Sequence, residues 1–526
     1  MRHALVIGAV AGLGALVALA CGSPDTPTGL AGGGTSGTSG TSGDDGTSGT
    51  SGTSGTSGTS GTSGGLATTT LKSGDVTLVG VTRDASPHAV YVTTAKTLEA
   101  VPVVGGSPTV IATGLVDNAR PSVRGGAVAW YTAVDATTGV GTINLWTKAG
   151  GAKLSLSTTS FVGLFTASAD GTRVAFGVDA TGPASAPVNA TNIAVTSAAS
   201  PSSAAVLSGL NAMNLAAATS SCPPDMSFVG NNFFAAYCTA TTATFVNARL
   251  VTVPAASGAP TVLVANTNGV SPTGIQPYWQ PDATGAKVFV IGLPGGSTPN
   301  QGRVVDVGSV TIADLDNSTE DGFMLGDGSA VIYKTGSTIK IASTAATPAI
   351  KTLNGSAKAM LAVSRDGSRL IFSALDPAAP NSTVDIKSID TTTQNQTGVD
   401  LVPTATALPV GFSATGAHVL YVDDIVATGG KLKAKPSTGG ADKTLASDVL
   451  GAVVPPAGTG VVAVTNPQKV GGIDLVDLSF VDIVAGGTPT PVGQGVPLSG
   501  GFKFSGNKLV YVRKGTTPGV FATALP

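Results

Sequence analysis

The densest group of possible metal ligands in this chain is an acidic segment, Asp-Leu-Asp-Asn-Ser-Thr-Glu-Asp, at residues 314–321. Asp314, Asp316 and Ser318 place oxygen atoms at alternate positions, and oxygen is the ligand that calcium prefers. The segment has Thr at its sixth place and Leu at its twelfth, where an EF-hand calcium loop has Gly and Glu. We therefore interpret it as an acidic turn, with calcium at these three residues as the alternative and no other cofactor predicted.

Residues that could form a catalytic centre are few. The chain has three histidines, of which His3 lies in the N-terminal segment discussed below, so that His88 and His418 remain. Two histidines exclude a three-histidine metal site, and no Gly-x-Ser-x-Gly sequence supplies the nucleophile turn of a hydrolase. Asp423 and Asp424 are adjacent, and on a strand their side chains would point to opposite faces and could not flank one scissile bond. We interpret the pair as a solvated loop end. The sequence predicts a protein that is not an enzyme.

Large aromatic residues are the remaining candidates for a binding role. Trp130, Tyr131, Trp146, Tyr278 and Trp279 stand out in a chain in which aromatic residues make up only 5%. Such rings stack against sugars or anchor the side chains of a protein partner when they are exposed, and they fill the interior when they are buried. Both interpretations are open at this stage.

The N-terminus is typical of a secreted protein. A basic start is followed by an apolar segment, residues 4–20, that is short for a membrane span and suits a cleaved signal peptide. The end of this segment, Ala18-Leu19-Ala20-Cys21, resembles the lipobox of bacterial lipoproteins, although the order of Ala18 and Leu19 departs from the usual pattern. The resemblance implies cleavage before Cys21, acylation of that residue, and attachment to a membrane through lipid. With Gly22 next, the outer membrane of the cell envelope is the expected location, and an ordinary secreted protein is the alternative.

The segment that follows the lipobox is of low complexity. Residues 21–65 consist of the cysteine and a tract in which Thr-Ser-Gly repeats from Thr35 onward. Such a sequence buries too little apolar surface to offset the entropy of ordering it. We predict a flexible linker that spans about 35 to 40 Å. A hydroxyl-rich stalk that binds or carries glycans is the alternative.

The rest of the chain, residues 66–526, is large and weakly charged. Charged residues make up 11% of the chain and its net charge is −2, so no basic surface for nucleic acid is expected. With Cys21 assigned to lipid, Cys222 and Cys238 remain as an even number in an oxidising compartment. A disulfide between them is predicted, and two reduced thiols are the alternative.

This body contains an internal repeat of a tight turn followed by an apolar strand. Two copies are nearly the same: Ser-Ala-Asp-Gly-Thr-Arg-Val-Ala-Phe at 168–176 and Ser-Arg-Asp-Gly-Ser-Arg-Leu-Ile-Phe at 364–372. Weaker copies begin at Asp282, Gly326, Ser413 and Ser505, and degenerate ones begin near Asp84, Arg124, Gly230 and Pro456. Asp-Gly supplies the tight turn, and a strand that is apolar throughout is buried on both faces. No segment has the period of an α-helix, so the body is predicted to be all-β.

The pattern Ser-x-Asp-Gly-x-Arg-hydrophobic-x-Phe is similar to the repeats of TolB-type β-propellers and of the propeller domains of prolyl-oligopeptidase-like proteins. The resemblance covers most of residues 75–526, and it implies that the body, residues 66–526, is a β-propeller with frequent contacts with other proteins. Ten copies exceed the four to eight blades of most propellers. The prediction is therefore one large ring of about seven to ten blades or two smaller propellers, with a β-solenoid or a row of β-sandwiches as the alternative. The last unit lacks an outer strand, which we expect residues 67–71 to supply.

Together these features predict an envelope-anchored lipoprotein whose propeller binds a protein or an envelope polysaccharide and catalyses nothing. A hydrolase or lactonase in the central channel of the propeller and a carbohydrate-binding surface lectin are the alternatives. Which membrane face it occupies and which partner it binds do not follow from the sequence.

Overall fold

The structure is a computed structural model that describes residues 66–135, 140–161, 164–181, 189–210, 225–240, 246–265, 278–292, 301–375, 384–402, 407–426 and 429–526. Within these ranges the chain forms β-strands and no helix. This part of the chain accordingly contains no helix long and apolar enough to span a membrane. The all-β prediction is confirmed.

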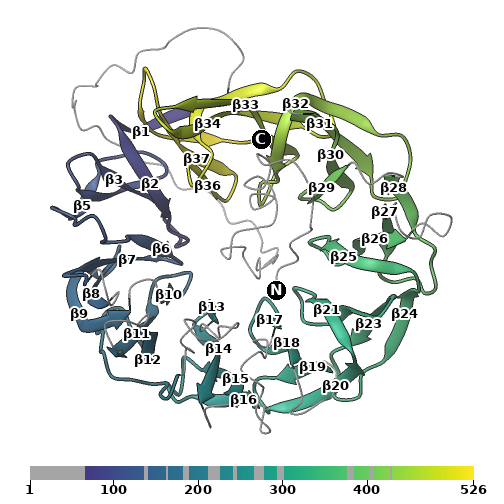
Figure 1. The fold of residues 1–526 in the computed structure, drawn as a ribbon, viewed down its shortest axis with the longest axis horizontal. Coiled ribbons are helices and arrows are strands. Elements are labelled where there is room, and N and C mark those ends of the chain that lie inside the picture. Colours follow the sequence, from purple (N-terminus) through teal and green to yellow (C-terminus); the bar gives the residue numbers. More distant parts are fainter. Residues whose placement is uncertain are drawn as a thin grey trace, which may run out of the picture.

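The described strands form a ring of nine antiparallel sheets that radiate from a common centre, and we divide them into blades 1 to 10 in chain order, with two blades in the seven-stranded sheet (Figure 1). The first strand of each blade lies toward the centre of the ring and the last lies at its rim. Blade 1 contains β2 (Val76–Val81), β3 (His88–Thr93), β4 (Leu98–Pro102) and β5 (Thr109–Ala112), and blade 2 contains β6 (Ser122–Arg124), β7 (Ala127–Thr132), β8 (Val140–Thr147) and β9 (Gly151–Phe161). Blade 3 contains β10 (Phe165–Ala167), β11 (Arg173–Thr181) and β12 (Asn189–Ser197), and blade 4 contains β13 (Asp225–Val229), β14 (Asn232–Ala240), β15 (Val246–Val253) and β16 (Thr261–Ala265). Blade 5 contains β17 (Tyr278–Pro281), β18 (Lys287–Gly292), β19 (Gln301–Asp306) and β20 (Thr311–Asn317).

The second half of the ring repeats this arrangement. Blades 6 and 7 contain β21 (Thr319–Met324), β22 (Ala330–Thr335), β23 (Thr338–Ser343) and β24 (Ile350–Asn354); β25 (Ala357–Val363), β26 (Arg369–Leu375), β27 (Val384–Asp390) and β28 (Val399–Val402). Blades 8 and 9 form one seven-stranded sheet of β29 (Leu408–Phe412), β30 (His418–Val426), β31 (Gly429–Pro436), β32 (Lys443–Val453), β33 (Gly460–Val470), β34 (Ile473–Asp482) and β35 (Thr490–Pro497). Blade 10 contains β36 (Phe502–Ser505), β37 (Lys508–Arg513), β38 (Gly519–Ala524) and β1 (Thr68–Ser73).

The apolar core is divided into ten clusters, and each cluster joins two successive blades. One of them brings Val510 and Val520 of blade 10 together with Leu78 and Tyr91 of blade 1. The second strands of the blades are the most deeply buried, as expected for strands that contact a neighbour on both faces. Ten interfaces between ten blades, the last with the first, make one closed ring rather than two propellers.

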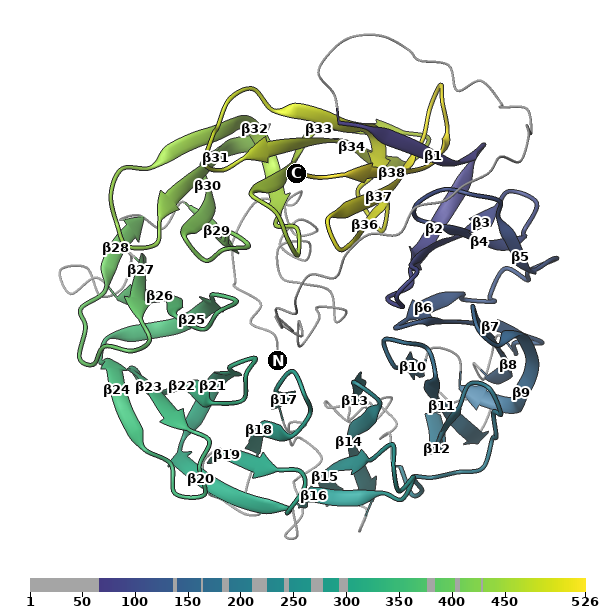
Figure 2. The same ribbon diagram turned by 180° about the vertical axis from the view of Figure 1, so that it is seen from behind.

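The ring is closed by its first and last strands. β1 pairs with β38 from Thr68 with Thr523 to Ser73 with Gly519, so blade 10 contains strands from both ends of the body. Figure 2 shows this purple strand lying along the yellow strands of blade 10. The expected pairing of residues 67–71 with the last unit is confirmed, with the strand beginning one residue later and ending two residues later. Closure removes the edge that an open sheet would expose at this point.

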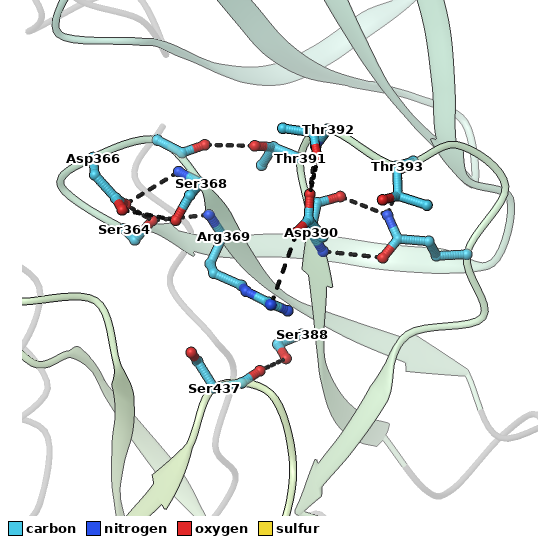
Figure 3. Close-up of polar contacts among 12 residues, drawn as sticks. Ser364, Asp366, Ser368, Arg369, Ser388, Asp390, Thr391, Thr392, Thr393 and Ser437 are labelled. Carbon is cyan, nitrogen blue, oxygen red and sulfur yellow. Dashed lines mark hydrogen bonds and ion pairs between the residues drawn. The ribbon is translucent and has the colours of Figure 1, made fainter.

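The repeated Asp-Gly motif forms the turn between the first and second strands of a blade. In blade 7, Ser364 Oγ donates a hydrogen bond to Asp366 Oδ1 (2.6 Å), and the backbone N–H of Arg369 donates to Ser364 Oγ (2.9 Å) (Figure 3). The same two bonds in blade 3 measure 2.6 and 3.0 Å. Burial opposes ionisation of Asp366, but the hydrogen bonds from Ser364 and Ser368 outweigh it and lower the pKa of its carboxyl group. The motif is therefore a self-contained polar turn.

The glycine of this turn has two functions. Gly367 adopts a φ of +72°, a conformation that side chains disfavour. A Cβ atom at this position would also lie 2.9 Å from a side-chain carbon of Leu325, in the preceding blade. Gly171 has the same φ, and its Cβ would lie 2.6 Å from the backbone oxygen of Gly126 in blade 2. The turns thus pack against one another between neighbouring blades, and glycine permits the close contact.

Candidate binding pocket

A pocket of about 630 Å³ opens at the junction of blades 8 and 9. Its walls come from β32, from β33, and from Ser479 and Pro489 of β34 and the loop after it. The lining residues are Ala446, Ser447, Asp448, Ala463, Thr465, Asn466, Pro467, Ser479 and Pro489. The pocket therefore combines hydroxyl, carboxylate and amide groups with four small apolar residues, and it contains neither lysine nor arginine.

The pocket forms where one strand belongs to two blades. The first part of β32 pairs with β31 as the outer strand of blade 8, and its second part pairs with β33 as the inner strand of blade 9. Asp448 lies at the change-over with a φ of +57°, which aspartate tolerates better than most residues. Gly429 lies against the backbone of Asp448, where a Cβ atom would be 2.6 Å from its carbonyl carbon. The bend in β32 thus depends on a close approach that only glycine allows.

A second irregularity shapes the opposite wall. β33 pairs with β34 at Thr465 and again at Gln468, and the register shifts between them. Asn466 has a φ of +53° there, and its Nδ2 donates a hydrogen bond to Asp477 Oδ2 (2.7 Å). The other carboxylate oxygen of Asp477 accepts a hydrogen bond from the backbone N–H of Gly495 (3.0 Å). Asn466 is therefore held in place by a carboxylate that is itself fixed to β35.

Three polar side chains of the lining have unused hydrogen-bonding capacity. Within the described part of the chain, no hydrogen bond or ion pair engages the side chains of Ser447, Asp448 and Ser479. Ser447 and Asp448 are exposed, and Ser479 is half-buried. These groups, together with the free oxygen of the Asn466 amide, can form hydrogen bonds with a ligand.

None of the pocket residues was singled out from the sequence. The available signals were weak: Ser447-Asp448 lies between two apolar pairs, 445–446 and 449–450, and Asn466-Pro467 follows an apolar run at 461–464. Each signal alone is equally consistent with the end of a strand. Their proximity follows from the shared strand β32, which no local pattern indicates.

For three of the five large aromatics, the structure decides in favour of a role in the interior. Trp130 and Tyr131 are each 1% exposed and Trp146 is 5% exposed. Trp130 and Trp146 lie in the core between blades 1 and 2, and Tyr131 lies in the core between blades 2 and 3. These three rings fill space between blades, because strands that are covered on both faces need large apolar side chains.

The other two aromatics lie on an inner strand, near the centre of the ring. Tyr278 is 43% exposed, and its hydroxyl group donates a hydrogen bond to the backbone oxygen of Gly322 (3.1 Å). Trp279 stacks on Phe234 with a centroid distance of 6.0 Å, and its Nε1 donates to Asp225 Oδ2 (3.1 Å). Trp279 therefore connects blades 4 and 5, and Tyr278 is the member of the predicted set that remains exposed.

The acidic segment does not fit calcium. Arg303 Nε lies 3.1 Å from Asp314 Oδ1, and Lys340 Nζ lies 2.9 Å from Asp316 Oδ2. Asp316 Oδ2 also accepts a hydrogen bond from the hydroxyl group of Tyr333 (2.6 Å). Ser318 is the single residue between β20 and β21, with a φ of +65°. The charges that calcium would require are engaged by protein cations, and among the described residues no three His, Cys, Asp or Glu side chains gather as metal ligands.

The aspartate pair lies in a strand rather than at the end of a loop. Asp423 and Asp424 belong to β30, where Asp424 has a φ of +52° at an irregularity in the pairing. Asp423 pairs with Lys433 (2.9 Å) and Asp424 pairs with Lys431 (2.8 Å). The prediction of a loop end is wrong, because the hairpin continues beyond a bulge at this point. Each carboxylate is held by its own lysine on the neighbouring strand.

The cysteine predictions remain predictions. Cys21 and Cys222 lie outside the described residues. Cys238 lies in β14, where its backbone pairs with Ala248 of β15.

The two histidines lie in separate blades. His88 is 6% exposed, and its ring makes an edge contact with Trp146 at a centroid distance of 5.9 Å. Its Nδ1 has no hydrogen-bond partner among the described residues. Burial lowers the pKa of His88, and the nearby Asp84 carboxylate only partly opposes this effect. Burial also lowers the pKa of His418 in blade 8.

We expect the protein to lose stability as the pH falls below 6.5, the ordinary pKa of histidine. Below that pH the unfolded chain binds a proton that the folded chain does not, so the free energy of unfolding decreases until the pH reaches the lowered pKa. Replacing His88→Phe, which keeps a ring beside Trp146 without a titratable group, should reduce this dependence. Urea unfolding between pH 5 and pH 7.5 measures this pH dependence of the free energy of unfolding. The His418→Phe variant shows how much of it comes from the second histidine. Equal pH dependence in wild type and His88→Phe would contradict the assignment.

No protein-family model and no curated protein matches this sequence. The fold is similar to solved structures at low identity. A eukaryotic initiation factor has a TM-score of 0.41 and 10% identity, covering 70% of this chain and 88% of its own. The propeller domain of the Trilobed protease from Pyrococcus furiosus, described as having an open Velcro topology, has a TM-score of 0.33 and 12% identity, covering 57% of this chain and 92% of its own. A putative TolB from Agrobacterium tumefaciens has a TM-score of 0.27 and 15% identity, covering 42% of this chain and 79% of its own. The closed ring of radiating antiparallel sheets makes the chain a β-propeller.

Proposed function

We propose that this chain is a lipid-anchored protein of the cell envelope whose ten-bladed ring binds a protein or an envelope polymer and has no catalytic activity. The observation that carries the proposal is the position of β1. This strand begins at Thr68, three residues after the Thr-Ser-Gly tract ends, and it is the outer strand of blade 10. The described body thus begins at the rim of the ring, at the outer strand of blade 10.

The properties of the ring support binding rather than catalysis. Each interface between blades contains a buried apolar cluster, so the ring offers a firm framework for surface groups. Asp314 and Asp316, the acidic residues with which calcium could assist hydrolysis, are engaged by Arg303 and Lys340. The side chains that retain free hydrogen-bonding capacity include those of the pocket at blades 8 and 9.

Replacement of Cys21→Ser tests the anchor. We expect the wild-type protein to incorporate a fatty-acid label and to sediment with the membranes, and we expect the Cys21→Ser variant to remain in the soluble envelope fraction, since a single residue carries the acyl chains. Cys238→Ser is the matched control, which should keep both the label and the membrane association. Unchanged maturation and sedimentation of Cys21→Ser would refute the anchor.

The binding role is tested with the same soluble Cys21→Ser chain immobilised on a support. After incubation with an envelope extract, the immobilised chain with an intact ring should retain a specific component. The same chain with β1 deleted, in which the ring is opened, should retain less of it. Turnover on a panel of lactones and glycosides, with no component retained, would overturn the proposal in favour of an enzyme.

A further inference from the structure

We propose that the pocket at blades 8 and 9 binds a neutral sugar ring, as found in a glycan of the envelope. This inference rests on the proposed function, because it gives the binding ring a site and a class of ligand. The pocket volume of about 630 Å³ lies within the range of small-molecule sites in proteins.

The polar lining is richer in hydrogen-bond acceptors than in donors. The Asp448 carboxylate only accepts hydrogen bonds, and the hydroxyl groups of Ser447 and Ser479 both accept and donate. The Nδ2 group of Asn466 is held by Asp477 at 2.7 Å, which leaves the amide oxygen of Asn466 as an acceptor. A ligand that fits this set presents several O–H groups, and a carboxylate can accept two of them from neighbouring carbons of one sugar ring.

The charge and the apolar walls of the pocket further restrict the chemical class of the ligand. Asp448 is the only charged residue of the lining. No cation in the lining offsets the exposed Asp448 carboxylate, so its negative charge repels anionic ligands, and phosphorylated sugars and uronic acids are disfavoured. Pro467 and Pro489, with Ala446 and Ala463, supply short apolar surfaces against which the C–H groups of a sugar ring can pack. A neutral hydroxylated ring can both donate hydrogen bonds to the polar acceptors and pack its C–H groups against the apolar residues.

The site is also held in place before a ligand binds. Ala446 and Ala463 belong to the apolar cluster that joins blades 8 and 9. Asp477 fixes Asn466 and is itself fixed by the backbone of Gly495. Groups that are positioned by strands and by a second layer of hydrogen bonds lose less entropy on binding than groups on free loops.

Titration calorimetry of the full chain carrying Cys21→Ser tests the inference. The probes are neutral gluco-, galacto- and N-acetylglucosamine oligosaccharides, a polygalacturonate oligosaccharide as the anionic probe, and spermidine as an amine probe. We expect at least one neutral oligosaccharide to bind with a Kd of millimolar or tighter. Polygalacturonate and spermidine should bind more weakly than that sugar.

Two variants locate the binding. Asp448→Asn keeps the size of the side chain and suits a positive φ, so the fold is retained while the charged acceptor is lost. It should weaken binding of the sugar at least tenfold. Ser479→Val, which removes a hydroxyl group of the wall, should also weaken it. Asp474→Asn is the matched control, because Asp474 is an exposed acid on the same hairpin outside the pocket, and its loss should leave binding unchanged.

The result that overturns the inference is an absence of binding by every neutral sugar, or sugar binding that is equal in wild type and Asp448→Asn. Tighter binding of spermidine or polygalacturonate would overturn it as well. If the immobilised chain still retains its envelope component while the sugars do not bind, the inference fails and the proposed function stands. If neither is observed, both fail.

Discussion

Deletion of residues 68–73 is expected to open the ring and to cause the largest loss of stability of any short deletion in the linker or at the ends of the body. β1 supplies the fourth strand of blade 10 through five backbone pairs with β38, and Leu71 is buried in the cluster that joins blades 10 and 1. The loss of strand pairing and the loss of the buried Leu71 side chain together lower the free energy of unfolding by on the order of 5 kcal/mol. The deletion also exposes β38, whose Gly519 lies so close to Lys72 that a Cβ atom there would be 2.4 Å from its backbone oxygen.

Urea unfolding and hydrogen exchange measure this effect. The amides of residues 519–523 should lose protection in the deletion variant, and added peptide of residues 66–74 should restore it. Deletion of six residues from the Thr-Ser-Gly tract, 53–58, is the matched control, because it shortens the same N-terminal segment and leaves every described strand intact. Protection of β38 that survives the loss of β1 would show that closure does not depend on this strand.

Replacement of Glu99→Ala is expected to cause the second large loss. Glu99 is 8% exposed, and its Oε2 accepts hydrogen bonds from Lys72 Nζ (2.9 Å) and from the hydroxyl group of Tyr91 (2.8 Å). Lys72 lies on β1, so this ion pair crosses the seam between blade 10 and blade 1. Removal of the carboxylate leaves the buried Tyr91 hydroxyl group without an acceptor and the partly exposed Lys72 ammonium without its counter-charge, which together cost about 2 kcal/mol.

Glu99→Gln separates charge from hydrogen bonding in this network. It keeps an acceptor for Tyr91 and removes the negative charge, so an intermediate loss is expected. Asp117→Ala is the control, because Asp117 forms an exposed ion pair with Lys96 (2.6 Å) and its removal should leave the unfolding midpoint unchanged. Equal midpoints for Glu99→Ala and Asp117→Ala would show that the seam is not held by this pair.

The turn motif was predictable because it is local. Ser364, Asp366 and Gly367 form their hydrogen bonds within six residues, and the same letters at 168–171 form the same bonds. The apolar run after the turn indicated a strand covered on both faces, as observed. The second reason for glycine, its contact with Leu325 of the preceding blade, depends on how the blades are packed and could not be read from the motif.

Individual site residues were harder to predict, because exposure depends on the neighbouring blade. Trp130 and Tyr278 are both aromatic residues in strand-like segments, yet Trp130 is 1% exposed and Tyr278 is 43% exposed. Trp130 lies on a second strand between two blades and Tyr278 begins an inner strand. Likewise, the sequence left Asp316 open as an alternative calcium ligand, and only the ring places Lys340 and Tyr333 beside it.

The sequence by itself determined the class of fold, the repeated turn and the expected pairing of the two ends of the body, since periodicity and turn chemistry are properties of neighbouring residues. Only the tertiary structure decided that ten blades close one ring, because the number of blades depends on the interfaces between them. It also decided that Asp314 and Asp316 are engaged by cations and that Ser447, Asp448 and Ser479 share a pocket with Asn466. Those relations join residues from different strands and blades, which no local pattern specifies.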